Sequence, residues 1–537
     1  MMKTRFKRLL FYIIIGLLYM SCDRKTVERP NIVWIVAEDL SPEFLSIYGN
    51  ETIELPNLEL LAKKGIVFNN AYTPIPVCAP ARSALITGMY PTTIGTHNMR
   101  TYKSNQNINE PTLGIPSYSP IVPNGVKMFT EYLRIHGYYC TNNAKEDYNF
   151  KSLDSGWDES SPEAHWRNRP QNTPFFAVFN FGITHESQIW NQSNQPLLVS
   201  PEQVPVPPIF PNNEVVRKDL AIGYSNIIRL DQQIGKIIDQ LKEDKLFKKS
   251  VIFFYGDHGG PFPRYKRSLY ETGIKVPLIV KLPFNQSRDT TKDDFVSFVD
   301  FAPTVLSLAG IQPPDIMDGN PFLGSFASDD SINEIYATSN RFDEKIDMKR
   351  AIRSGNYKFI RNVYPEISNA LDISYRNSMP LMQNLFELHK NNQLDEHQNK
   401  WFDVPKPKTE LYDLSVDPYE LNNLAYQSEY HQMADSLSQK LDRWMLFSGD
   451  LGVYPEKELM NRWLIGGQNP ILLPPTATIK NDSIYLESPL EDATIVYRKN
   501  GNKRWDIYTQ PLSIEWNFES KAVRIGYKDS QVWTNPN

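Results

Sequence analysis

The sequence is poor in cysteine, in charge of one sign and in long apolar runs. Its 537 residues include 3 cysteines, too few and too odd in number for a disulfide scaffold. Basic residues number 57 and acidic residues 62, so the chain has no basic excess with which to bind nucleic acid. The apolar run at 9–20 is shorter than the roughly 20 residues that span a bilayer. These shortages argue against a disulfide-stapled domain, a nucleic-acid-binding protein and a polytopic membrane protein.

The N-terminus has the order of features typical of an export signal. Basic residues at 3, 5, 7 and 8 precede the apolar run, which ends at Ser21-Cys22. A small residue before cysteine resembles a bacterial lipoprotein signal, in which Cys22 carries lipid; an ordinary secretory signal is the alternative. We therefore expect a signal at 1–22, a linker at 23–30, and export to the periplasm or outer membrane surface, with a lipid anchor as the membrane contact.

The rest of the chain has ordinary globular composition, with 41% hydrophobic and 22% charged residues. Its length predicts roughly two to four domains. Continuous apolar runs predict buried strands at 31–37, 175–181, 251–255 and 276–280, and apolar periodicity predicts a long helix at 215–246. Such strands alternating with helices indicate an α/β domain, at 31–330, with a mostly parallel sheet covered on both faces.

Two smaller units are expected after this α/β domain. Shorter strand-like segments and a helix near 430–445 predict an α+β subdomain at 331–475. Strand-like segments without helical periodicity predict a small β-sandwich-like appendage at 476–537. The appendage resembles the immunoglobulin-like C-terminal modules of glycan-active enzymes.

Polar residues follow three of the predicted strands. Glu38-Asp39 follows the first, His185 follows the second, and Asp257-His258 follows the third. Because ligand sites in open α/β sheets lie at the carboxyl ends of strands, we expect these residues to converge. Each pair alone could be a solvated turn, but together they form an oxygen-rich set suited to Ca²⁺ or Mg²⁺.

The second cysteine lies in a short motif with its own chemistry. Cys78, Pro80 and Arg82 form C-x-P-x-R, and Thr87-Gly88 follows. This motif resembles the signature of type I sulfatases, whose cysteine is oxidised to formylglycine. Further segments resemble the family in the same order, at 31–40, 55–72, 251–260, 266–280, 299–311 and 410–425. The resemblance covers about 31–425 and is greatest to bacterial sulfatases grouped with heparan N-sulfatase; it implies an alkaline-phosphatase-like α/β sandwich.

The resemblance also implies a mechanism and a set of site residues. A formylglycine hydrate at residue 78 attacks sulfur beside a divalent cation, and its second hydroxyl later expels sulfate. The modification requires a formylglycine-generating or anaerobic maturation enzyme. The implied metal ligands are Glu38, Asp39, Asp257, His258 and residue 78. Arg82 would brace the nucleophile, Lys145, His185 and Lys266 would bind the sulfate, and His185 would also protonate the leaving group.

Two positions depart from the family pattern. Glu38 stands where an aspartate is usual, and its longer arm favours calcium, whose geometry is loose, over magnesium. Asp147 stands two residues after Lys145, where many sulfatases have histidine. Asp147 could be the base that opens the sulfo-enzyme, or that role could belong elsewhere.

The sequence says least about which substrate the protein acts on. Export and the possible sandwich module favour a sulfated polysaccharide or oligosaccharide, with sulfate esters or N-sulfate as the target. His97 and Arg100 could line the substrate entrance, and Arg341, Asp343 and Arg350 could contact sugar, although loop or surface roles are equally compatible. A phosphate or phosphonate ester hydrolase and a non-catalytic glycan-binding lipoprotein are the alternatives. Cys140 is expected to be a lone buried thiol.

Overall fold

The computed structural model describes residues 29–102, 115–286, 289–328 and 333–535. The expected signal at 1–22 and most of the linker at 23–30 lie outside the described residues. Among the helices of these four ranges, none combines the length and apolar character that a membrane crossing requires.

An eight-stranded sheet forms the centre of the molecule, with the strand order β4-β3-β5-β1-β6-β7-β2-β8. The strands are β1 Asn31–Ala37, β2 Ile66–Tyr72, β3 Tyr139–Asn143, β4 Glu159–Ser160, β5 Phe175–Phe181, β6 Ser250–Gly256, β7 Lys275–Lys281 and β8 Thr290–Ser297. β7 pairs antiparallel with β6 and β2, and the other pairings in this sheet are parallel. The predicted strands and the mostly parallel sheet are therefore confirmed.

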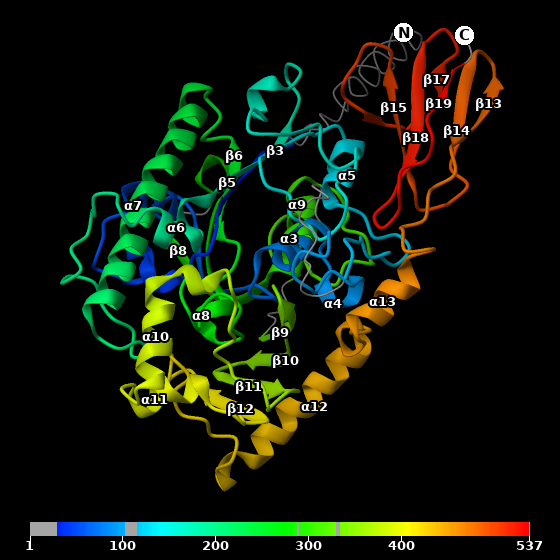
Figure 1. Ribbon diagram of the computed structural model, residues 1–537. Coiled ribbons are helices and arrows are strands. Elements are labelled where there is room, and N and C mark those ends of the chain that lie inside the picture. The colour runs from blue at the N-terminus through cyan, green and yellow to red at the C-terminus, as the bar shows by residue number, and fades with distance from the viewer. Residues whose placement is uncertain (1–28, 103–114, 287–288, 329–332, 536–537) are drawn as a thin grey trace, which may run out of the picture.

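Helices cover both faces of this sheet, as its continuous apolar strands predicted (Figure 1). Alternate residues of β1 enter two different cores: Trp34 lies in the core with α3 Cys78–Thr87, α5 Phe129–Ile135 and α9 Phe301–Leu308. Ile35 lies in the opposite core, with α2 Pro56–Lys63 and α7 Glu214–Glu243. The helix predicted at 215–246 is thus α7, with its asparagine cap at Asn213.

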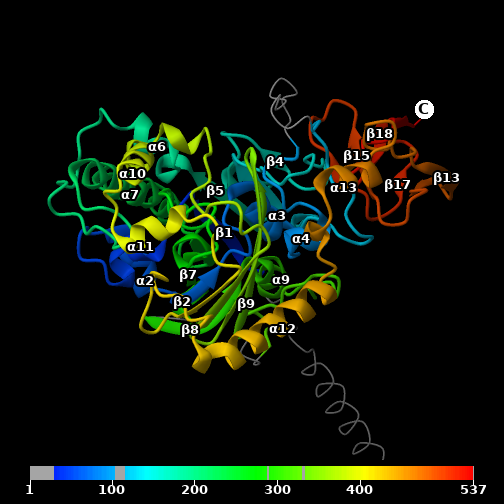
Figure 2. The same cartoon turned by 60° about the horizontal axis from the view of Figure 1, so that its bottom comes forward.

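A second, antiparallel sheet follows in the chain, with the order β12-β11-β10-β9. Its strands are β9 Glu334–Phe342, β10 Lys345–Ser354, β11 Tyr357–Asn362 and β12 Thr409–Asp413, and helices α10 Pro380–Lys390, α11 Glu396–Asn399, α12 His431–Phe447 and α13 Glu456–Trp463 accompany them. One face packs on α12 through Ile352 and Leu441 (Figure 2). The other face packs on the α/β unit through Ala351 and Tyr72.

The C-terminal residues form two small antiparallel sheets, β13-β14-β17 and β16-β15-β18-β19. Their strands are β13 Thr476–Lys480, β14 Ser483–Glu487, β15 Thr494–Lys499, β16 Asp506–Ile507, β17 Leu512–Ser513, β18 Phe518–Val523 and β19 Trp533–Thr534. Ile484 and Leu512 from one sheet pack with Ile495 and Phe518 from the other. This β-rich unit lies to one side of the molecule (Figure 1) and is held there partly by Arg524, which bonds to Val122 O and Asn124.

The sheet brings three strand ends to one edge. Ala37 at the end of β1 is in register with Phe181 of β5 and Gly256 of β6. The turn after β6 is tight: a Cβ at Gly259 would lie 2.0 Å from the carbonyl oxygen of Thr272. Glycine is therefore required where this turn packs against α8 Glu271–Ile274, the short helix that follows Lys266.

Candidate active site

The carboxylates that follow β1 and β6 meet at the strand ends. The backbone N–H of Asp39 donates to Asp257 Oδ1 at 3.0 Å, and His258 Nε2 lies 3.3 Å from Asp39 Oδ1. Asp39, Asp257 and His258 are each fully buried. The convergence expected from the sequence is therefore present at this edge of the sheet.

Cys78 is the first residue of α3 and lies against this group. Its Sγ is 3.3 Å from His258 Nε2, and the residue is fully buried. Burial alone would raise the pKa of the thiol, but the charges of Lys266 and Lys145 outweigh burial and lower the pKa to about 5. The position at a helix N-terminus acts in the same direction. The site therefore stabilises negative charge at the Cys78 side chain.

Several of these donors have the spacing of metal ligands. Asp39, Cys78 and His185 form one such group, and Cys78, Asp257 and His258 form another, each with its ligand atoms within 4.8 Å of one another. Carboxylate oxygens with an imidazole suit a divalent cation. Glu38 belongs to neither group, and its Oε1 lies 2.8 Å from Lys145 Nζ and 3.6 Å from Arg82. Four of the five predicted metal ligands thus come together, and Glu38 instead contacts the neighbouring cations.

The protonation of His258 is consistent with a cation site. Burial would lower the pKa of this imidazole, but Asp257, Cys78 and Asp39 outweigh burial and raise it to about 9. The surrounding negative groups therefore favour positive charge at this place. A metal ion bound by His258 would take the place of that proton.

Basic side chains also lie around Cys78 and the carboxylates near it. Lys266 Nζ lies 3.0 and 2.9 Å from the two oxygens of Asp39 and 3.2 Å from His185 Nε2. Arg82 donates to Asp257 Oδ2 at 3.0 Å. Of the three basic residues near position 266, the structure brings Lys266 to the site. Arg264 instead lies over the Tyr270 ring, and Arg267 binds Glu186.

Three further side chains hold this arrangement and were not predicted. Glu186 accepts two hydrogen bonds from Arg267, both at 2.8 Å, and pairs with Lys266 at 3.1 Å. Asn180, near the end of β5, accepts a 2.6 Å hydrogen bond from Arg82 and donates to Asn142. Glu186 and Arg267 each adjoin a predicted residue in the sequence, but adjacency alone does not reveal their mutual pairing.

The predicted substrate-side residues differ in exposure. Arg100 keeps 36% of its side chain exposed and lies 3.9 Å from Asp147, whose side chain is 20% exposed. His97 is buried in the core, and burial is the main cause that lowers its pKa to about 4. Arg341 is buried against Glu456, with hydrogen bonds of 2.5 and 2.7 Å. Arg100 and Asp147, which we call the mouth of the site, therefore keep partly exposed side chains near Cys78 and Arg82, whereas His97 and Arg341 are enclosed.

Two more residues weighed as sugar contacts also have protein partners. Arg350 is fully buried and forms a two-point pair with Asp450, at 2.6 and 3.0 Å. Asp343 accepts a 2.6 Å hydrogen bond from Arg267. Cys140, the other cysteine in the described residues, is fully buried, and burial raises its pKa well above the usual range.

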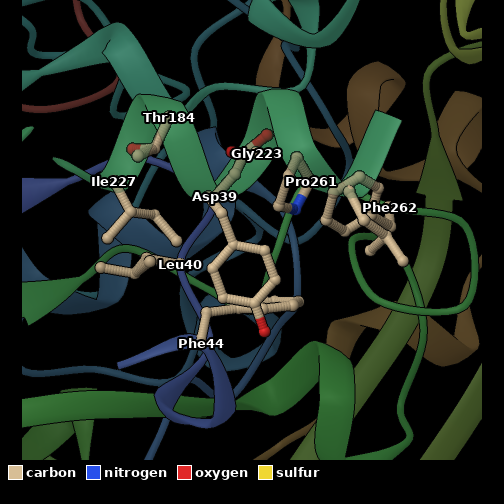
Figure 3. Close-up of a pocket in the computed structure, with 10 residues that line it drawn as sticks. Asp39, Leu40, Phe44, Thr184, Gly223, Ile227, Pro261 and Phe262 are labelled. Carbon is tan, nitrogen blue, oxygen red and sulfur yellow. The ribbon is translucent and has the colours of Figure 1, made fainter. Parts of the chain in front are cut away.

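The floor beneath Asp39 is apolar. Figure 3 shows a small pocket there, whose lining includes Leu40, Phe44, Ile227 and Phe262. Gly223 of α7 makes this packing possible, because a Cβ there would lie 2.8 Å from the Phe262 ring. Apolar packing behind Asp39 separates it from bulk water, which strengthens the electrostatic interactions in front of it.

The arrangement can therefore stabilise a nucleophile and bind an anion. Residue 78 lies against carboxylates and an imidazole that could hold a metal ion, Lys266 and Lys145 supply positive charge, and His185 lies 3.2 Å from Lys266. With the mostly parallel sheet, these features define a hydrolase of the alkaline-phosphatase-like class.

Comparison with known proteins places the chain within that class. The sulfatase family model matches residues 30–311, and the model of the N-sulphoglucosamine sulphohydrolase C-terminal region matches residues 256–404. An ulvan-active sulfatase of Formosa agariphila is 38% identical over 555 residues, which cover 95% of this chain and 92% of the relative. The chain therefore belongs to the sulfatase family, whose enzymes hydrolyse sulfate esters.

Solved structures confirm the expected fold. The structure of BT4656 in complex with its substrate D-glucosamine-2-N,6-O-disulfate matches with a TM-score of 0.56 at 18% identity, covering 79% of this chain and 98% of that one. A phosphonate monoester hydrolase of Agrobacterium radiobacter matches with a TM-score of 0.55 at 16% identity, covering 86% and 100%. At these identities the two likenesses concern the fold alone.

Proposed function

We propose that this protein is an exported sulfatase that removes sulfate from a sulfated polysaccharide or its oligosaccharides, using formylglycine made from Cys78 and a calcium ion. One observation carries the proposal: Cys78 is fully buried at the start of α3, with Sγ 3.3 Å from His258 and with Lys266 and Lys145 lowering its pKa. Negative charge at residue 78 and on a bound sulfate is stabilised by these two lysines.

The proposed ligands of the cation are Asp39, Asp257, His258 and residue 78, with Glu38 near them. A bound divalent cation would activate the nucleophile and polarise a sulfate oxygen. Calcium is favoured over magnesium because Glu38 has a side chain one methylene longer than that of the usual aspartate, and calcium accepts the irregular geometry that this would give.

The other residues of the site have separate roles in this proposal. Lys266 and Lys145 neutralise the sulfate oxygens as charge builds on them, and Arg82 braces the side chain of residue 78. His185 donates a proton to the leaving oxygen; Ser187 Oγ, 2.9 Å from His185 Nδ1, fixes the ring. Asp147 is placed at the mouth beside Arg100, where it could serve as the base that opens the sulfo-enzyme.

The substrate class rests on the relatives and on the accessible rim. The relative is named as active on ulvan, and the matching C-terminal model is named for N-sulphoglucosamine, so both names refer to a sulfated saccharide. Arg100, at the mouth, suits a second anionic group on such a glycan. O-sulfate and N-sulfate both fit the site. Export as a lipoprotein anchored through Cys22, and maturation by a formylglycine-generating or anaerobic maturation enzyme, complete the proposal.

The test is a desulfation screen with protein matured in its native host. Sulfated oligosaccharides with O- and N-sulfate are compared with phosphate and phosphonate esters, and released sulfate or phosphate is measured. We expect sulfate release from at least one saccharide. Strong preference for phosphate or phosphonate would instead favour the ester hydrolase alternative, which shares this fold.

Mass spectrometry provides an independent readout. The tryptic peptide that contains residue 78 should carry an aldehyde in place of the thiol. An unmodified cysteine in active, natively matured protein would contradict the proposed nucleophile. An unmodified cysteine with no turnover would support the glycan-binding alternative.

A further inference from the structure

An exposed tyrosine, Tyr375, lies beside His185, and Trp190 packs against it. The ring of Tyr375 is 6.2 Å from the His185 ring, and 5.4 Å from the ring of Trp190. The planes of Trp190 and Tyr375 meet at 75°, so the two rings form a corner. Tyr375 is 43% exposed, although a large aromatic side chain would gain free energy from burial.

The two rings come from separate parts of the chain. Trp190 lies on α6 Ser187–Asn191, the helix that begins two residues after His185. Tyr375 precedes the short 3₁₀ turn Arg376–Ser378, which leads into α10. Both α6 and α10 lie on the α7 side of the molecule in the two views (Figures 1 and 2). The corner therefore joins the α/β unit to the segment between β11 and β12 of the second sheet.

Tyr375 is exposed on a firmly held segment. The next residue, Arg376, is buried, bonds to Leu371 O, and lies 5.3 Å from the Trp401 ring. On the other side, the N–H of Ser374 donates to Glu344 Oε1 at 2.6 Å. Because its neighbours are anchored on both sides, the exposed ring has a defined position next to His185.

We propose that Tyr375 and Trp190 form an aromatic platform that packs against the pyranose ring of the substrate, on the leaving-group side of the sulfate. This inference rests on the proposed function. A general acid must lie within about 3 Å of the leaving oxygen, so the group bonded to that oxygen must lie beside His185. The Tyr375 ring lies next to His185, and the Trp190 ring packs against Tyr375, so both rings are near that group. A pyranose presents C–H groups on its faces, and these pack well on an aromatic surface.

The platform contrasts with the charged part of the mouth. Arg100 and Asp147 offer charge and hydrogen bonds, whereas Tyr375 and Trp190 offer apolar surface. A sulfated sugar has both characters: charged substituents at its edge and apolar ring faces. The platform therefore selects saccharides by their rings, independently of the groups that bind sulfate.

The experiment measures kcat and KM on the best sulfated oligosaccharide of the screen, with inorganic sulfate as a competitive inhibitor. We expect Tyr375→Ala and Tyr375→Leu to raise KM about tenfold, because the packing of the ring is lost. Tyr375→Phe should keep KM near the wild-type value. The inhibition constant of inorganic sulfate should not change in any of these variants, because sulfate binds to the lysines. Tyr485→Ala is the matched control: Tyr485 is 40% exposed, on β14 of the C-terminal unit.

The outcomes separate this inference from the proposed function. Wild-type turnover with an unchanged KM in both Tyr375→Ala and Tyr375→Leu would overturn the platform alone. An equal loss in Tyr375→Phe would also overturn it, since that variant keeps the ring. A wild type that neither desulfates nor binds any saccharide, by calorimetry, would overturn the proposed function and the platform together.

Discussion

Buried charged side chains are paired differently in the second sheet and at the ends of β1 and β6. In the second sheet, Arg350 and Asp450 form a closed two-point pair, and so do Arg341 and Glu456. At the ends of β1 and β6 the partners are shared. Lys266 contacts Asp39, Glu186 and His185 together.

The difference between closed pairs and shared partners helps to distinguish a reactive site from a structural ion pair in this protein. A closed arginine–carboxylate pair has no capacity left for a ligand, whereas a shared network beside a nucleophile can exchange partners when an anion or cation binds. Burial and charge alone therefore do not identify the site, and neither does sharing alone, since Lys358 of the second sheet also pairs with both Glu271 and Glu420. The site is marked by a shared network that lies beside a candidate nucleophile, residue 78. Substitutions in the two regions should separate activity from stability.

The largest effect is expected from Cys78→Ala. Loss of the nucleophile should reduce turnover on the order of 10⁴-fold or more. Cys140→Ala is the matched control, because Cys140 is equally buried but lies on β3, away from the metal-ligating groups. It should keep near wild-type turnover. Sulfate release and thermal unfolding are measured for both variants, and substantial activity in Cys78→Ala would remove residue 78 from the mechanism.

Lys266→Met should give the next largest loss. The variant lacks the positive charge that stabilises the sulfate oxygens in the transition state, so kcat should fall about 10²- to 10³-fold. The matched control is Lys358→Met, which removes a buried lysine paired with Glu271 and Glu420 at 3.0 and 2.9 Å. That variant should lose stability while its folded fraction keeps kcat. Equal kcat losses in the two variants would mean that position 266 acts through structure alone.

Arg350→Met should change stability rather than chemistry. Removal of the guanidinium leaves the Asp450 carboxylate buried without its partner, which should lower the free energy of unfolding by ~3 kcal/mol. Denaturant unfolding measures this loss, and steady-state kinetics on the folded protein should give an unchanged KM. A raised KM with unchanged stability would instead revive the sugar-contact role considered for Arg350.

The same contrast explains how far the sequence could lead. The strands β1, β5 and β6 were predictable because buried parallel strands have continuous apolar sequences, and the polar residues after them follow from topology. The roles of Cys78 and Arg82 came from the resemblance to sulfatases. The closed pairs were not predictable, because Arg341 and Glu456 meet only after folding. An arginine that will be buried therefore has the same local sequence signals as one that will bind sugar.

The aromatic corner escaped prediction for a related reason. Trp190 follows His185 closely, but Tyr375 lies in a segment without strong periodicity, between β11 and α10. Its position depends on the burial of Arg376 and on the hydrogen bond of Ser374, both of which are tertiary contacts. For His97 the sequence left an entrance role and a loop role open, and the structure buries its side chain.

The smallest effect concerns a buried carboxyl whose neighbouring cation, Lys218, does not offset its burial. Asp219 on α7 is 1% exposed, and its Oδ2 accepts a 2.7 Å hydrogen bond from the N–H of Leu381 on α10. Burial raises its pKa to about 7, despite this hydrogen bond. At Asp39, by contrast, Lys266 and the nearby histidines overcome burial and hold the pKa well below its usual range. The two buried aspartates should therefore affect stability with opposite dependence on pH.

The sign for Asp219 follows from proton binding. Between its ordinary pKa near 3.8 and about 7, the folded chain holds a proton that the unfolded chain releases. Asp219 therefore contributes a decrease in the free energy of unfolding as pH rises through this window, and a constant term above it. Asp219→Asn should remove that decrease, so the difference between variant and wild type should grow from pH 5 to pH 8. Denaturant unfolding at both pH values measures it. A difference independent of pH would show that Asp219 is already ionised in the folded protein at pH 5. Burial between α7 and α10 would then not raise the pKa of Asp219, and the contrast with Asp39 would fail.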